Sequence, residues 1–247
     1  MAAALTIKSI SPTDPVSWKD RFFLTFDVDW AHDEVLADTM QIVSDAGSAA
    51  TWFVTHDTSL LRDMRTLPEW ELGIHPNFNT LLIGGASHVT TAVKILDNLM
   101  QIAPEAVSVR SHSMTQSSPL LDVFARAGLT HDVNHLVPSG SRIPVRPWLL
   151  WNGMFRIPYI WEDDLHCAYQ NSRQPELEPA SVVAEGMPGL KVFDFHPIHV
   201  FLNTESLDRY ERTRPIHREP SELIKHRFEG YGTRSRLIDL LTLASKP

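Results

Sequence analysis

Carboxylate, imidazole and guanidinium side chains follow apolar stretches of the sequence at several points. Asp27 and Asp29 end the run FFLTFDVD, in which alternation places residues two apart on one face of a strand. His75 ends a second apolar run, Arg110 a third and His196 a fourth. Two neighbouring carboxylates are costly to bury unless a cation neutralises them or one keeps its proton. The pattern therefore predicts a metal site or an acid–base site.

Such side chains act together only if the fold brings the strand ends to one place. Short β-rich runs alternate with longer helical stretches, which is typical of βα units and a parallel sheet. No glycine-rich phosphate loop follows the first strand, so we favour a closed or partly closed barrel over an open sheet. The C-terminal strand ends of βα barrels form the active face.

The expected elements cover most of the chain. We expect strands at 21–28, 49–55, 70–75, 107–110, 129–133, 148–151, 154–157 and 190–196, and helices at 33–46, 58–66, 87–102, 117–127 and 234–243. No proline-rich linker divides the chain. We therefore expect an N-terminal extension at residues 1–20 and a single α/β domain over residues 21–247, including the C-terminal helix.

The composition bounds the class of protein. The chain has 247 residues, with 22 Lys and Arg against 30 Asp and Glu, for a net charge of −8. This balance argues against a nucleic-acid partner and against docking to an anionic membrane. No apolar run reaches the roughly 18–20 residues of a membrane span, and Met1–Asp14 lacks a signal-peptide pattern, so we expect a cytoplasmic protein. The single cysteine, Cys167, excludes a cysteine-based zinc site.

Five motifs together resemble those of a known enzyme family. They are TFDVDW at 25–30, ELGIHPNF at 71–78, VRSHS at 109–113, FRIPYIWEDD at 155–164 and DFHP at 194–197. The chain is similar in these motifs, and in their order, to the polysaccharide deacetylases of carbohydrate esterase family 4, in a branch with Asp-x-Asp in the first motif. The resemblance implies a distorted (β/α)7-type barrel of parallel strands.

The resemblance also implies roles for individual residues. The family holds a divalent metal with one aspartate and two histidines. By this comparison, Asp27 is the general base and Asp29 a metal ligand, while His75 is the first histidine ligand. Arg110 orients the base, and His196 is the general acid.

One position departs from the family pattern. The second motif of the family is H-x-x-x-H, but Asn79 stands four residues after His75. The next histidine is His88, after a Gly-Gly-Ala-Ser loop that could fold back, and we expect it to be the second histidine ligand. Asn79 with a water is the alternative. Zinc suits the resulting set of one oxygen and two nitrogens, although cobalt, nickel and iron suit it too.

Further residues are candidates for catalysis and substrate binding. His199 is a second candidate for the acid, and Asp194 could orient His196. Trp30, Tyr159 and Trp161 could stack on a sugar ring, and Asp163 could contact its hydroxyl groups, although ordinary packing or an acidic turn explains each of them equally well. Three other histidines near strand ends are expected to be ordinary structural residues; they are His112, His131 and His135.

These features predict a metal-dependent hydrolase that removes an N-acetyl group from a sugar. The substrate would be an N-acetylated sugar or its nucleotide- or lipid-linked precursor, in the biosynthesis of a surface polysaccharide such as O-antigen. One alternative is hydrolysis of a non-sugar amide such as a ureide. Another, suggested by Asn79, is an inactive sugar-binding barrel. A non-haem iron oxygenase also uses two histidines and a carboxylate, but the βα alternation argues against it. The oligomeric state is not indicated.

Overall fold

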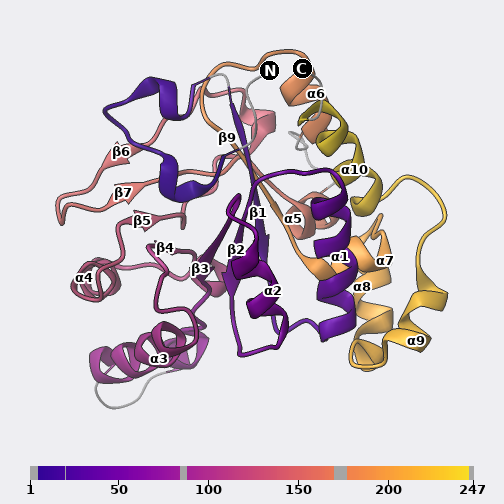
Figure 1. Cartoon of the computed structure of the whole chain (residues 1–247), viewed down its shortest axis with the longest axis horizontal. Coiled ribbons are helices and arrows are strands. Elements are labelled where there is room, and N and C mark those ends of the chain that lie inside the picture. The colour runs from indigo at the N-terminus through magenta and orange to yellow at the C-terminus, as the bar shows by residue number, and fades with distance from the viewer. Residues whose placement is uncertain (1–4, 20, 84–87, 170–176, 245–247) are drawn as a thin grey trace.

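A single curled sheet forms the centre of the protein in a computed structural model (Figure 1). The structure describes residues 5–19, 21–83, 88–169 and 177–244, without the side chains of residues 83, 88–90 and 244. The strands are β1 Phe22–Asp27, β2 Ala50–Val54, β3 Trp70–Ile74, β4 Ser108–Val109, β5 His131–Asp132, β6 Trp148–Leu149, β7 Phe155–Arg156, β8 Trp161–Glu162 and β9 Lys191–Phe195. The helices of four residues or more are α1 Asp33–Asp45, α2 Leu60–Thr66, α3 His88–Ile102, α4 Ser118–Arg126, α5 Asp163–Ala168, α6 Pro179–Ala184, α7 Pro197–Leu202, α8 Leu207–Thr213, α9 Pro220–Leu223 and α10 Thr233–Ala244, with the 3-10 helix η3 Asn79–Ile83.

The strand order is β6-β7-β5-β4-β3-β2-β1-β9-β8, and every pair is parallel except β6 with β7. Residues 155–162 supply both β7, which pairs with β5, and β8, which pairs with β9. The N–H of Ile157 donates to the Asp132 carbonyl and the N–H of Ile160 to that of Val192. This stretch therefore links the two sides of the sheet, and the result confirms the predicted distorted (β/α) barrel.

The longest strands are buried on both faces, as expected for parallel strands covered by helices. All six residues of β1 are buried, and Phe26 stacks on Trp52 with ring centroids 4.2 Å apart. Helix α1 packs beside α7, and α7 beside α10, on the outer side of β1 and β9 (Figure 1). No helix within the described ranges is long and apolar enough to cross a membrane.

The N-terminal segment covers the end of the sheet opposite the strand ends that carry the polar residues. Ile7 and Ile10 are at most 1% exposed. The N–H of Ile7 donates to Thr51 Oγ1 at 3.0 Å, and the N–H of Lys8 donates to Glu71 Oε2 at 2.8 Å. Thr51 and Glu71 lie near the starts of β2 and β3. The segment thus contributes to the core at the N-terminal end of the strands.

Candidate active site

The structure brings the five strand-end residues together at one edge of the sheet. Asp27 ends β1 and Asp29 follows two residues later, while His75, Arg110 and His196 come directly after β3, β4 and β9. All but Asp29 are at most 6% exposed. They line a small cavity of about 70 Å³. Buried groups of opposite charge therefore surround a space that could hold the reacting part of a substrate.

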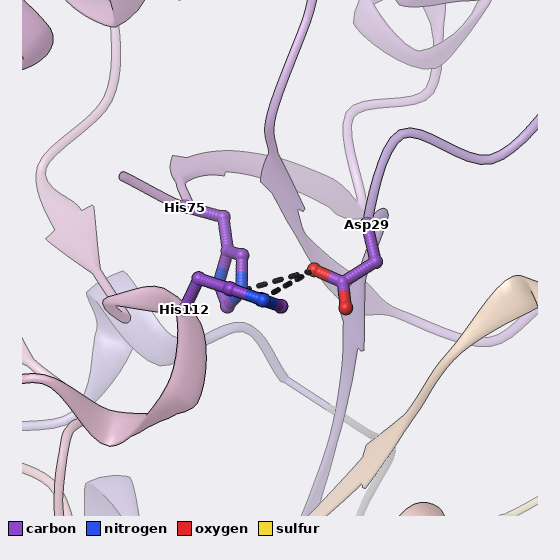
Figure 2. A group of neighbouring side chains, drawn as sticks. All are labelled: Asp29, His75 and His112. Carbon is purple, nitrogen blue, oxygen red and sulfur yellow. Dashed lines mark hydrogen bonds and ion pairs between the residues drawn. The ribbon is translucent and has the colours of Figure 1, made fainter. Parts of the chain in front are cut away.

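Asp29 and two imidazole rings form a compact cluster in this cavity (Figure 2). Asp29 Oδ1 lies 3.2 Å from His75 Nε2 and 3.1 Å from His112 Nδ1, and the two nitrogens are 3.4 Å apart. Burial alone would raise the pKa of Asp29, but hydrogen bonds with His112 and His75 hold it well below its usual value. The carboxylate is therefore ionised and faces both rings.

Left-handed backbone surrounds two of the three cluster residues. Asp29 and Trp30 have φ angles of 45° and 53°, and Ser113 and Met114, directly after His112, have 56° and 52°. Each such non-glycine residue costs about 1 kcal/mol or more. The fold holds these angles in two of the three loops that carry the cluster residues, and strained backbone of this kind is common at functional sites.

His112 differs from the expectation of an ordinary structural histidine. It follows β4 two residues after Arg110, and its ring points at Asp29 (Figure 2). The alternation of residues i and i+2 that singles out Asp27 and Asp29 applies equally to Arg110 and His112. That signal is present in the sequence and could have identified the residue.

Two residues are expected from the sequence to complete the cluster, His88 or, as the alternative, Asn79. His88 begins α3, and its side chain lies outside the described part of the chain. Asn79 Nδ2 donates to Ser113 Oγ at 3.2 Å, and Asn79 Oδ1 accepts from Thr115 Oγ1 at 3.4 Å. Asn79 therefore supports the loop that carries His112 through these two hydrogen bonds.

The cluster fits a divalent cation. One carboxylate oxygen and two imidazole nitrogens are a donor set of catalytic zinc sites, in which a fourth position stays open. A tetrahedral ion with bonds of about 2.0–2.1 Å separates its ligand atoms by roughly 3.3–3.4 Å. The separations here, 3.1, 3.2 and 3.4 Å, are close to that value.

Asp27 lies beside the cluster and is bound by Arg110. Arg110 Nη1 is 3.0 Å from Asp27 Oδ1 and also pairs with Asp194, while Nη2 donates to Thr25 Oγ1 at 3.0 Å. Burial alone would lower the pKa of Arg110, but Asp194 and Asp27 raise it. The guanidinium thus supplies positive charge to two buried carboxylates. The second oxygen of Asp27 lies 3.5 Å from His75 Nδ1.

His196 is oriented by Asp163. The backbone N–H of His196 donates to Asp163 Oδ2 at 2.8 Å, and His196 Nδ1 lies 2.7 Å from Asp163 Oδ1. His196 Nε2 then lies 3.7 Å from Asp29 Oδ2. Burial alone would lower the pKa of His196, but Asp163 and Asp29 raise it well above its usual value. A protonated imidazole in this position is suited to general acid catalysis.

Comparisons with known proteins show the family to which the chain belongs. The family model described as WbmS-like polysaccharide deacetylase matches residues 24–214, a range that contains every residue of the site. The chain belongs to the WbmS-like polysaccharide deacetylases. The solved structure of WbmS from Bordetella bronchiseptica, described as a polysaccharide deacetylase involved in O-antigen biosynthesis, is 44% identical to it, with a TM-score of 0.88 and 98% of each chain covered. The predicted family and enzyme class are thereby confirmed.

Two further solved structures are more distant from this deacetylase. A protein from Mycobacterium smegmatis, described as a polysaccharide deacetylase, is 15% identical, with a TM-score of 0.47 and 90% of each chain covered. A family 4 carbohydrate esterase from Streptomyces lividans in complex with acetate is 11% identical, with a TM-score of 0.46 and coverage of 91% of this chain and 88% of the other. None of the curated proteins matches the chain.

Two of the three aromatic rings expected to stack on a sugar are covered in this deacetylase. Tyr159 is 1% exposed and Trp161 is 0% exposed. The Tyr159 ring lies 4.5 Å from the Arg110 guanidinium carbon, and the Trp161 ring packs on Phe195. Neither ring presents a face to a substrate, because packing around Arg110 and the core occupies it. Trp30 is half-buried and lines a larger cavity, so it remains a candidate for sugar binding.

Three polar residues have roles that differ from the sequence-based expectations. Asp163 is 0% exposed, and its two oxygens accept from His196, so it positions that histidine and does not face the substrate. Asp194, expected to orient His196, pairs with Arg110. His199 is buried one turn along α7, where burial lowers its pKa. Of the two candidate acids, His196 has the partner that favours the protonated ring.

Proposed function

We propose that this deacetylase removes the acetyl group from an N-acetylated sugar at a metal centre formed by Asp29, His75 and His112. One observation carries the proposal. Three donor atoms from separate loops lie 3.1–3.4 Å apart, next to both a carboxylate and a histidine that can exchange protons with a substrate. A divalent ion held there, most readily zinc, would polarise the acetamide carbonyl and favour ionisation of a water.

On one side of the cluster, Asp27 acts as the general base. It accepts a proton from the water that attacks the acetamide carbon. Arg110 holds the carboxylate in place through the contact at 3.0 Å. Because Arg110 also contacts Asp194, the base is fixed to the neighbouring strand β9 as well as to its own strand.

His196, next to Asp29, acts as the general acid. Asp163 accepts the Nδ1 proton, so the Nε2 proton faces the cavity and is delivered to the departing nitrogen. The C–N bond of the acetamide breaks, a C–O bond to the water oxygen forms, and the products are acetate and a sugar amine. Acid and base thus both lie beside the cluster, with side-chain atoms within 4.8 Å of each other.

The proposal also covers the biosynthetic pathway in which the enzyme acts. The WbmS relative is described as involved in O-antigen biosynthesis, and it matches this chain over 98% of both lengths. We propose that the substrate is a precursor of a similar surface polysaccharide, with the sugar carried on a nucleotide or a lipid. Nucleotide-linked sugars are cytoplasmic compounds, so a nucleotide-linked precursor would place the enzyme in the cytoplasm.

Acetate release from N-acetylated sugars tests this function. We expect zinc-loaded wild-type protein to release acetate from an N-acetylhexosamine derivative and not to hydrolyse the ring amide of the ureide allantoin. Asp27→Asn should lower kcat by about 100-fold or more, because it removes the base and keeps the shape. Asp45→Asn, at the exposed end of α1, is the matched control and should retain activity. Hydrolysis of allantoin alone, or full activity in Asp27→Asn, would contradict the proposal.

A further inference from the structure

A second, larger cavity of about 540 Å³ adjoins the catalytic cluster. Asp29, His112 and His196 line both cavities, so the two spaces meet at the reacting groups. The wall away from the cluster comes from α8 and the residues directly after it, up to Arg218. Ligand pockets commonly have volumes of about 300–1,000 Å³. The space is therefore large enough for a whole sugar with a substituent.

Two arginines stand on this outer wall. Arg214 is paired only loosely, because its partner Glu211 is 3.3 Å away and the two side chains are 67% and 51% exposed. Such exposed pairs contribute little stability, so a ligand can replace the partner. Arg218 also lines the cavity and makes no ion pair with any residue in the described ranges. Guanidinium groups bind carboxylates and phosphates through paired hydrogen bonds.

A buried polar atom on the same cavity wall also lacks a partner. His199 is 3% exposed, and its Nδ1 makes no hydrogen bond with the described protein atoms. Its ring stacks on Tyr210, whose ring in turn lies 4.8 Å from that of His217. All three side chains line the cavity. The stacked rings therefore form an aromatic part of the cavity wall beside the two arginines.

The acidic groups of the cavity lie mostly at the catalytic end. Asp29 faces the two cluster histidines, with Oδ1 3.2 Å from His75 Nε2 and 3.1 Å from His112 Nδ1. Asp164 also lies at this end, where Glu162, Asp164 and His196 have side-chain atoms within 4.8 Å of one another. The charge of Glu211 is matched by Arg214. The outer wall thus keeps an excess positive charge.

We propose that Arg214 and Arg218 bind an anionic oxygen group of the sugar substrate while its acetamido group lies at the Asp29 cluster. This inference rests on the proposed function and names the class of sugar: one with a carboxylate or a phosphate beside the N-acetylated ring. Both groups offer the planar or tetrahedral oxygens that arginine recognises. A ring carboxylate and the diphosphate of a carrier are the two sources of that chemistry.

Three probe compounds separate these sources. They are the methyl glycoside of N-acetylglucosamine, the methyl glycoside of N-acetylglucosaminuronic acid, and UDP-N-acetylglucosamine. Binding is measured by calorimetry and turnover by acetate release, for the zinc-loaded full chain. The variant is Arg214→Gln with Arg218→Gln. The matched control is Arg212→Gln, an exposed arginine of α8 that pairs with Asp208 and is not part of the cavity wall.

We expect wild type and Arg212→Gln to bind at least one anionic compound ten-fold or more tightly than the neutral glycoside, and the double variant to lose at least ten-fold of that preference. The preferred compound identifies the source as carboxylate or phosphate. Equal binding of all three by wild type, no binding of any, or a preference that survives in the double variant overturns the proposal. Anion-dependent binding without acetate release from any compound would support the subsite and contradict the proposed function. Acetate release without an anion preference would support the proposed function and contradict the anion subsite.

Discussion

Asp163 determines which nitrogen of His196 faces the substrate. It accepts from both the backbone N–H and the ring of that residue, so the side chain has one orientation and one tautomer. A histidine acid needs its proton on the nitrogen that faces the departing amine. A buried carboxylate that contacts neither the substrate nor the cluster therefore controls catalysis through another residue.

Replacing Asp163 should separate catalysis from metal binding. We expect Asp163→Asn to lower kcat by about 100-fold, since a neutral amide of the same shape neither fixes the tautomer nor supports the imidazolium. The metal content should stay that of wild type, because Asp163 makes no contact with the three donor atoms. Steady-state kinetics and elemental analysis on one preparation measure both. Asp208→Asn, an exposed acid of α8, is the control. Unchanged kcat would contradict the assigned role.

The strand-end pattern identifies residues whose position depends only on a strand. Asp27, His75, Arg110 and His196 follow apolar runs directly, and each lies where such a run ends. Alternation also marks His112, two residues after Arg110, but the left-handed turn that follows it is not indicated by any residue type. Likewise, burial of the rings of Tyr159 and Trp161 depends on Arg110 and on β9, far away in sequence. Long-range packing of this kind is not readable from local alternation.

At the scale of elements, the longest elements are the most readily predicted. The strands of five or six residues, β1, β2, β3 and β9, all correspond to predicted runs, and so do the long helices α1, α3, α4 and α10. The seven-residue α2 and the two-residue strands β4 to β7 also lie in predicted runs, but the helices α5 to α9, of four to seven residues, and the two-residue β8 do not. Yet α5 carries Asp163, so short elements matter directly to the site.

The contact between the N-terminal segment and β2–β3 predicts a pH effect on stability. Glu71 accepts from the Lys8 N–H at 2.8 Å, from Thr51 Oγ1 at 3.0 Å and from Ser108 Oγ. Burial raises the pKa of Glu71 above its ordinary value of 4.5. A carboxyl with a raised folded-state pKa binds its proton more tightly when folded. The free energy of unfolding therefore falls as pH rises from 4.5 through the folded pKa.

Glu71→Gln should remove this dependence. We expect its stability relative to wild type to increase with pH over that window, by an amount of the order of 1 kcal/mol. Urea unfolding at a series of pH values from about 4 to 8 measures it. Glu105→Gln, at a carboxylate that is 41% exposed, is the control and should show no such trend. A difference between Glu71→Gln and wild type that stays constant with pH would contradict this account.

At the scale of the whole molecule, the barrel joins residues that are far apart in the chain. Asp29, His75 and His112 come from the ends of β1, β3 and β4, and His196 comes from the end of β9. The parallel order of these strands places all four ends at one edge. The 44% identical relative matches over 98% of both chains with a TM-score of 0.88, so the two proteins share the fold over almost their whole length. A metal bound there would connect three loops of the fold.

The metal content of purified protein tests the central claim most directly. Elemental analysis after zinc loading and dialysis should give about one ion per chain for wild type, for His88→Ala and for His226→Ala, an exposed histidine outside the site. His112→Ala should lose the ion, because it removes one of the three donors. Metal lost from His88→Ala and kept in His112→Ala would contradict the account and return His88 to the cluster.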